Sequence, residues 1–233
     1  MTTTPLAQFD GNFLDGLEFC SRVYAFFESI RTSDNGPSRL RLRPSRLEKK
    51  LLEELLPICK YVQASYRPGR YMSVRWVDGN QQYDAEVLQR GAYVSQSYYP
   101  ATGYLEVTCT MHPNEYLGRE LLDKKGEAFG LEGIRRLKNG EIESISVGYT
   151  NKEFIDSYCQ LVLGQIAKKA KMPYPENTTL VVQCTLNTIY MPDEWESLIT
   201  RVKDAPPQSS FREIYLYDTV CQYSQTLYPR SST

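Results

Sequence analysis

The amino-acid sequence predicts an α/β protein in which helices flank a central mixed β-sheet. Segments with apolar residues at helical spacing are interleaved along the chain with short segments that alternate like strands. Residues 178–185 (TTLVVQCT) are almost continuously apolar, which is typical of a strand buried on both faces of a sheet. The length of 233 residues suits a single large domain, residues 1–233.

The first 44 residues are expected to form a helical extension followed by a linker. Apolar side chains recur at helical spacing over residues 13–30, which predicts an amphipathic helix. Residues 32–44 (TSDNGPSRLRLRP) are rich in turn-forming types, so we expect a loop there.

A second helix is predicted over residues 45–66, and it contains a candidate acidic residue. Ser45 and Glu48 have the spacing of a capping box, and Pro57 is expected to kink the helix or to start a new segment. Glu48 also falls near the middle of the apolar arc of this helix, where a carboxylate could contribute to a metal site. The capping role explains the same residue without any function.

Strands and helices alternate through the rest of the chain. Asp78-Gly79 and Asn139-Gly140 are typical of hairpin turns, and Pro113 suits the first position of a helix. We expect strands at residues 71–77, 83–88, 104–110, 178–185 and 213–217, and helices at 113–125, 151–171 and 192–202.

Composition and charge are those of an ordinary globular protein. Hydrophobic residues make up 41% and charged residues 24% of the chain, and the net charge is −1. No apolar run approaches the roughly 18 residues of a membrane span, and the N-terminus lacks the features of a secretory signal. The six cysteines form no C-x-x-C pair, which disfavours a zinc site and a disulfide framework. We expect a reduced, cytoplasmic protein without a membrane partner.

Two local features are compatible with nucleic-acid binding. Residues 39–50 hold six basic side chains against one acidic one, although a solvated linker would look much the same. The candidate phosphate-binding residues are Arg41, Arg43 and Arg46. Among the 18 tyrosines, the pair Tyr98-Tyr99 could stack on bases, but tyrosine is equally suited to half-buried strands.

The most specific signal is a pair of acidic residues on two neighbouring predicted strands. Asp84 lies in the strand at 83–88, and Glu106 lies in the strand at 104–110. If these strands are neighbours, the two carboxylates can converge on one side of the sheet and bind a divalent cation such as Mg²⁺ or Mn²⁺. His112, the only histidine, follows directly and is a candidate general base.

Each of these residues also has a purely structural explanation. Asp84 could be an ordinary solvent-facing residue beside a turn. Glu106 could pair with Arg75 or Arg90 across the sheet. His112, which precedes Pro113, could cap the following helix.

The order of elements from Ser45 onward resembles the PD-(D/E)XK, or restriction-endonuclease-like, superfamily. In that superfamily a helix, three strands, a helix and a strand form the core. An acidic residue lies near the second strand and a (D/E)-x-K motif on the third, often with a glutamate from the first helix. The matching residues here are Asp84, Glu106 and Glu48. The resemblance implies a nuclease-like core over residues 45–185 and a C-terminal addition over 186–233.

The chain departs from the motif at its lysine. Thr108 stands where the family has a lysine that helps to activate the attacking water. Some family members place that lysine on a neighbouring helix, so Lys124, Lys125 or Arg119 could replace it.

Two hypotheses follow from the sequence. The first is a metal-dependent nuclease that acts on DNA or RNA, with Asp84 and Glu106 as metal ligands and Glu48 and His112 as further catalytic residues. The second is a catalytically inactive nuclease-like fold that binds a nucleic acid, a protein partner or a second copy of the chain. No phosphate-binding glycine motif G-x-x-x-x-G-K-[ST] is present, which disfavours a nucleotide hydrolase of the P-loop class.

Overall fold

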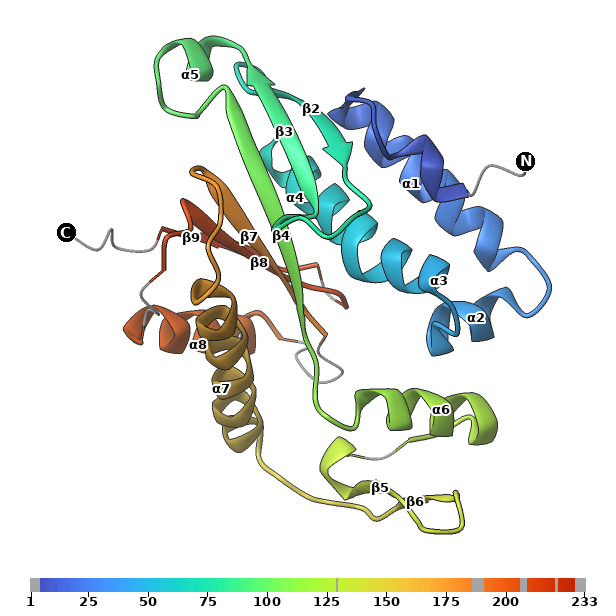
Figure 1. Cartoon of the computed structure of the whole chain (residues 1–233). Coiled ribbons are helices and arrows are strands. Elements are labelled where there is room, and N and C mark those ends of the chain that lie inside the picture. The colour runs from blue at the N-terminus through green and yellow to red at the C-terminus, as the bar shows by residue number, and fades with distance from the viewer. Residues whose placement is uncertain (1–4, 129, 186–190, 206–208, 221, 229–233) are drawn as a thin grey trace.

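A seven-stranded mixed sheet lies at the centre of the protein, with helices on both of its faces (Figure 1). The computed structural model describes residues 5–128, 130–185, 191–205, 209–220 and 222–228. The strands of the sheet, in spatial order, are β1 (Leu14–Asp15), β2 (Tyr71–Trp76), β3 (Ala85–Arg90), β4 (Thr102–Thr110), β7 (Thr178–Cys184), β8 (Glu213–Asp218) and β9 (Ser224–Leu227).

The sheet has an antiparallel half and a parallel centre. Neighbouring strands from β1 to β4 are antiparallel, β4, β7 and β8 are parallel, and β9 returns antiparallel to β8. Every residue of β7 is buried, which confirms the expected strand covered on both faces. A separate two-stranded hairpin, β5 (Ile134–Arg136) and β6 (Ile142–Ser144), turns at Asn139-Gly140 as predicted.

The helices form two layers, one on each face of the sheet. The principal helices are α1 (Gly16–Arg31), α2 (Gly36–Leu42), α3 (Arg46–Lys50), α4 (Leu56–Ser65), the single turn α5 (Ala92–Ser95), α6 (Glu115–Lys125), α7 (Asn151–Ala170) and α8 (Pro192–Asp204). Figure 1 shows α1, α3 and α4 on one side of the sheet and α7 and α8 on the other.

Each layer contributes a separate apolar core. On the first face, Phe19 of α1 and Val62 of α4 belong to one cluster with Val181 of β7. On the second face, Val162 of α7 joins a different cluster that includes Val182, the next residue of β7. Because successive strand residues point to opposite faces, one apolar strand joins both cores. The result confirms an α/β fold with a mixed sheet between helices.

The prediction of a loop over residues 32–44 was wrong, because Gly36–Leu42 form helix α2. Gly36 packs so closely on the end of α1 that a Cβ atom would come within 2.1 Å of the carbonyl oxygen of Ile30. Proline in the first turn of a helix sacrifices no hydrogen bond, so the turn-like sequence here starts a helix.

The helix expected over residues 45–66 is divided into three parts. The Ser45 hydroxyl accepts a hydrogen bond from Leu47 N at 3.2 Å, and the Glu48 carboxylate accepts one from Ser45 N at 3.2 Å, which confirms the capping box. A π-helical turn, η2 (Leu51–Leu55), then separates α3 from α4, and Pro57 lies in the first turn of α4 as expected.

The remaining predicted elements are present, with ends shifted by a few residues. The strand expected at 83–88 runs from Ala85 to Arg90, so Asp84 immediately precedes it. The edge strands β1 and β9 were not predicted, because both are short and neither has a clear alternating pattern. Within the described part of the chain, none of the helices has both the length and the apolar character required to cross a lipid bilayer.

Candidate functional site

Asp84, the residue just before β3, lies beside β4, the strand that carries Glu106. Asp84 N donates a hydrogen bond to Leu105 O at 2.8 Å, next to the pair Ala85–Leu105 that ends the antiparallel register of β3 and β4. Glu86 and Tyr104 form another cross-strand pair, and Asp84 and Glu106 each lie two residues beyond it, towards the same end of the sheet. Val107 N donates a further hydrogen bond to Asp84 Oδ2 at 2.7 Å, which fixes this carboxylate beside β4.

The two carboxylates have an electrostatic environment that disfavours their charged forms. Burial, followed by the negative charges of Glu54 and Glu106, raises the pKa of Asp84 to about 7. Burial also raises the pKa of Glu106, although Lys169 counteracts part of this effect. Carboxyl groups whose pKa is raised by burial and by nearby negative charges are characteristic of functional sites.

The positive charge at this site comes from helix α7. Lys169, in the last turn of that helix, forms an ion pair with Glu106, whose side chain is only 10% exposed. Tyr174 also lies near this site, because burial together with the charges of Glu106 and Asp84 raises the pKa of its hydroxyl. Neither residue was identified from the sequence.

A third carboxylate approaches from the π-helical turn. Glu54 Oε1 accepts a hydrogen bond from Lys50 Nζ at 2.5 Å, and Glu54 Oε2 accepts one from Trp76 Nε1 at 3.1 Å. The charge of Glu54 raises the pKa of both Asp84 and Glu106. Glu54 therefore adds negative charge near the Asp84–Glu106 pair, while its own carboxylate is bound by Lys50 and Trp76.

Glu48, the helix acid selected from the sequence, occupies a different place. Its carboxylate accepts hydrogen bonds from Ser45 and pairs with Arg39 at 2.6 Å, and its side chain is 1% exposed. These partners and burial account for the carboxylate without a catalytic role. Six residues later, Glu54 is the acid of this helical region that influences Asp84 and Glu106.

His112 lies beyond the end of β4, and its side chain binds the backbone at the start of α6. Its Nδ1 accepts a hydrogen bond from Asn114 N at 3.1 Å just before α6. The residue lines a separate cavity of about 660 Å³ between α2, α6 and α7, together with Arg41 and Arg43. The structure therefore does not bring His112 together with Asp84 and Glu106.

The three arginines selected as phosphate contacts all have acidic partners. Arg41 pairs with Asp123 at 2.9 Å, Arg43 pairs with Glu53 at 2.7 Å, and Arg46 pairs with Asp78. The candidate replacements for the motif lysine on α6 are also engaged locally, since Lys124 contacts Glu120 and Arg119 contacts Glu115. Lys125, the third candidate replacement, lies in the last turn of the same helix.

The acidic pair suits an oxygen-binding cation such as Mg²⁺ or Mn²⁺ better than one that prefers nitrogen or sulfur ligands, such as Zn²⁺. The described residues include no group of three or more histidine, cysteine, aspartate or glutamate side chains arranged to enclose an ion. Mg²⁺ and Mn²⁺ accept oxygen ligands, and Mg²⁺ is commonly held by one or two carboxylates, with water and substrate phosphate completing its coordination. Asp84 and Glu106 have the side chains of that pattern, and burial is the main cause of the raised pKa values of both.

The cysteine of β4, which is the one nearest to Glu106 in the sequence, is poorly suited to thiol chemistry. Cys20, Cys59, Cys109, Cys159 and Cys184 are free thiols, and Cys221 lies outside the described residues. Burial raises the pKa of Cys109, the cysteine of β4, to about 12, so its thiolate is scarce at neutral pH.

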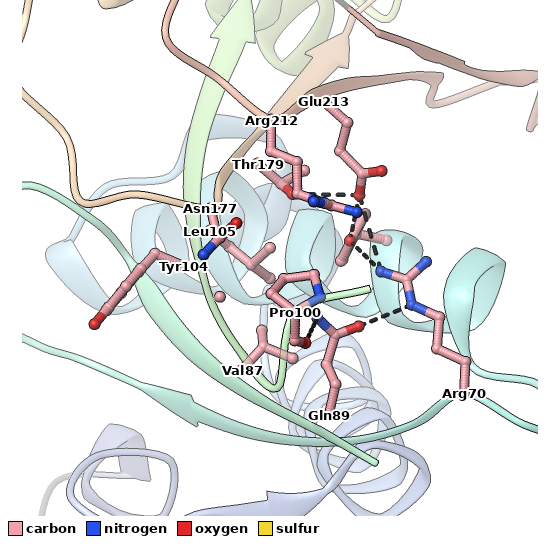
Figure 2. A pocket seen from close by; sticks show the side chains of 12 residues that line it. Arg70, Val87, Gln89, Pro100, Tyr104, Leu105, Asn177, Thr179, Arg212 and Glu213 are labelled. Carbon is pink, nitrogen blue, oxygen red and sulfur yellow. Dashed lines mark hydrogen bonds and ion pairs between the residues drawn. The ribbon is translucent and has the colours of Figure 1, made fainter. Parts of the chain in front are cut away.

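A second buried polar cluster lies near the start of β7 and β8 (Figure 2). Arg70 donates hydrogen bonds to the Tyr61 hydroxyl at 2.9 Å and to Gln89 Oε1 at 2.8 Å. The Tyr61 hydroxyl in turn donates to Glu213 Oε1 at 2.5 Å, and Thr179 Oγ1 donates to the same oxygen at 3.2 Å. The space left among these side chains is about 10 Å³, room for one water molecule at most. This cluster is therefore a structural network.

Comparison with known proteins identified no relative of this chain. No model of a protein family matches it, and no curated protein and no solved structure matches it either.

Proposed function

We propose that the chain is a metal-dependent nuclease that hydrolyses phosphodiester bonds in nucleic acid, with Asp84 and Glu106 as ligands of Mg²⁺ or Mn²⁺. The observation that carries this proposal is the position of the Asp84 carboxylate beside the strand of Glu106, where Asp84 Oδ2 accepts a hydrogen bond from Val107 N, with the Lys169 ammonium held against Glu106. Two acids and one lysine are the groups that the PD-(D/E)XK motif supplies.

The arrangement of elements supports the same assignment. The helical segment α3–η2–α4 precedes three antiparallel strands, and α7 lies in the connection that returns the chain to β7, parallel to β4. With α5, α6 and the β5–β6 hairpin taken as insertions, this order resembles the αβββαβ order of a restriction-endonuclease-like core. In this assignment Lys169 replaces the lysine that is missing at Thr108, and Glu54 replaces Glu48 as the acid from the first helix.

Each side chain has a defined task in the proposed reaction. A bound divalent ion lowers the pKa of a coordinated water and draws charge from the phosphoryl group. Asp84 and Glu106 would hold that ion, and the nearby Glu54 would increase the negative potential that attracts it. The Lys169 ammonium would stabilise the negative charge that develops on phosphate oxygens. In the structure Lys169 is paired with Glu106. When Glu106 binds the ion, Lys169 would leave this carboxylate and contact the phosphate.

Cleavage assays with matched variants test the proposal. Supercoiled plasmid, single-stranded DNA and single-stranded RNA are incubated with Mg²⁺ or Mn²⁺ and either the wild type, Asp84→Asn or Glu106→Gln. Glu143→Gln is the control, because Glu143 pairs with Arg135 on the separate β5–β6 hairpin. We expect cleavage by the wild type and the control and its loss in both site variants. Equal cleavage by all four proteins would reveal a contaminating nuclease and contradict the assignment.

A catalytically inactive nuclease-like fold is the second candidate. It is favoured by Thr108, which is 8% exposed and cannot supply a positive charge at the motif position. Absence of cleavage by the wild type with either ion, combined with nucleic-acid binding that Asp84→Asn leaves unchanged, would favour this candidate.

A further inference from the structure

A shallow hollow at the end of the sheet where β4 begins is lined entirely by arginine and tyrosine. Its volume is about 360 Å³, and it is formed by segments that are far apart in the sequence. Its lining residues, which we call the tyrosine–arginine platform, are Arg67, Tyr93, Tyr98, Tyr99, Arg212 and Tyr228. Three of the tyrosines are exposed to solvent, namely Tyr93 at 38%, Tyr98 at 63% and Tyr228 at 68%.

Three guanidinium groups converge on one ring of the platform. The centroid of Tyr99 lies 3.6 Å from Arg70 Cζ and 5.9 Å from the Cζ atoms of both Arg67 and Arg212. The Arg67 guanidinium is also 5.7 Å from the ring of Tyr93. Stacking on tyrosine holds these cations in place while their N–H groups remain able to donate to an anion.

The positive charge of the platform is not balanced by acids. Arg67 donates to the Tyr99 hydroxyl at 2.9 Å, and Arg212 donates to the Tyr98 carbonyl at 2.7 Å. Within the described ranges, neither exposed arginine forms an ion pair, whereas the buried Arg70 has Glu213 at 3.9 Å. A chain with a net charge of −1 therefore carries a local cationic surface.

Hydrogen bonds hold the base of the platform in place. Tyr93 N donates to Gly69 O at 2.9 Å, which fastens the turn α5 to the turn at residues 67–70. Beneath Tyr99, Arg70 is anchored by Gln89 and by the Tyr61–Glu213 pair (Figure 2). A preformed surface loses less conformational entropy on binding.

We propose that the tyrosine–arginine platform binds single-stranded nucleic acid, with bases stacked on the exposed tyrosines and phosphates bound by Arg67 and Arg212. Aromatic rings beside cationic groups are the features that recognise single strands without sequence preference, because every base presents a flat face. In a duplex these faces are covered by neighbouring bases, so a duplex would contact the arginines alone. Binding here needs no hydrolysis, since the platform shares no residue with the Asp84–Glu106 pair.

Fluorescence anisotropy tests this inference separately from the proposed nuclease activity. The full chain carrying Asp84→Asn, in EDTA, is titrated against labelled oligothymidine and oligouridine of about 16 nucleotides, the upper end of site sizes for such surfaces. We expect Tyr98→Ala to weaken binding about 10-fold or more, and Tyr98→Phe to retain it, because stacking needs the ring and not the hydroxyl. Binding of either oligonucleotide in this pattern supports the platform, whether or not the wild type cleaves.

The arginines give an independent measurement. Combined Arg67→Ala and Arg212→Ala substitutions are expected to weaken binding and to reduce the slope of log K against log salt by about 1.4, for two lost phosphate contacts. Arg22→Ala is the control, because Arg22 pairs with Glu18 on α1. Circular dichroism confirms that each variant is folded. Affinity unchanged by the platform substitutions, wild-type binding weaker than about 100 µM, or tighter binding to a duplex of the same length would overturn the inference.

Discussion

Lys169 and Glu106 form an ion pair between the last turn of α7 and the middle of β4, across 63 residues of sequence. The lysine side chain is 28% exposed, whereas the glutamate is 10% exposed, so the cation lies at the solvent edge of a largely buried acid. In the proposed reaction, this lysine would supply the positive charge that Thr108 cannot.

Replacement of Lys169 should affect activity and stability together. Lys169→Met leaves Glu106 buried without its cation, so we expect the free energy of unfolding at pH 8 to fall by about 1–3 kcal/mol. Cleavage should fall by about 100-fold or more, because the charge that stabilises the transition state is removed. Urea unfolding and initial cleavage rates measure the two effects.

The adjacent lysine provides the control for this experiment. Lys168 is exposed on the same helix, so Lys168→Met should leave both measurements nearly unchanged. The double variant Lys169→Met/Glu106→Gln should recover stability but not cleavage. Equal losses in the Lys168 and Lys169 variants would show that the Lys169–Glu106 contact has no special role.

Asp84→Asn should make the protein more stable while abolishing cleavage. The pKa of Asp84 rises from an ordinary value of 3.8 to about 7 on folding, so the native state is progressively penalised as pH rises between these values. The asparagine variant avoids this penalty. Each pKa unit corresponds to about 1.4 kcal/mol, and water screens the half-buried group, so we expect a gain of about 2 kcal/mol above pH 7.

The pH dependence distinguishes this effect from a general improvement in packing. The stability difference between the variant and the wild type should be small at pH 4, grow towards pH 7 and stay constant above it. Thermal unfolding across this range measures it. A difference that is already complete at pH 4 would contradict the raised pKa of Asp84.

Divalent-cation binding should release protons near neutral pH. Asp84 must be ionised to bind an ion, and its pKa of about 7 means that much of it is protonated at pH 6.5. Mn²⁺ affinity should therefore increase with pH and level off above about pH 8. Calorimetry in two buffers of different ionisation enthalpy counts the released protons. Affinity that does not vary between pH 6 and pH 8 would exclude Asp84 as a ligand.

Gly91→Ala should destabilise the turn that carries the platform tyrosines. Gly91 has φ +116°, and a Cβ atom there would lie 2.6 Å from Gly69 O. We expect a loss of about 1–3 kcal/mol in the free energy of unfolding, because the backbone conformation and the close approach both exclude a side chain. Gly164→Ala is the control, since this helical glycine has open space around it and should gain about 0.5–1 kcal/mol.

The position of the acidic pair was accessible from the sequence, but its cation was not. Asp84 immediately precedes β3 and Glu106 lies on β4, and these strands follow each other closely in the chain, so the proximity of the two residues depends on a single antiparallel pairing. Lys169 reaches Glu106 only because α7 packs on the sheet in one particular register. That register is determined by side-chain packing over the whole helix, which local periodicity does not report.

The choice between Glu48 and Glu54 shows a different limit of sequence patterns. A regular helix from Ser45 places Glu48 on the apolar face, and its capping role was correctly expected. The π-helical turn Leu51–Leu55 contains one extra residue, which rotates the following side chains by about 100° relative to a regular helix. Helical-wheel analysis assumes that no such turn occurs.

The parallel pairing of β4 with β7 imposes an order on folding. Asp84 and Val107 are joined by a hydrogen bond that closes a loop of 23 residues, whereas Cys109 and Gln183 meet across β4 and β7 at a separation of 74 residues. Closure of the longer loop costs more chain entropy, and the N-terminal part leaves the ribosome first. The shorter loop can therefore close first, which would bring the two acids together before Lys169 of α7 is in place. In the proposed nuclease, a chain synthesised only as far as β4 would lack the cation of the site.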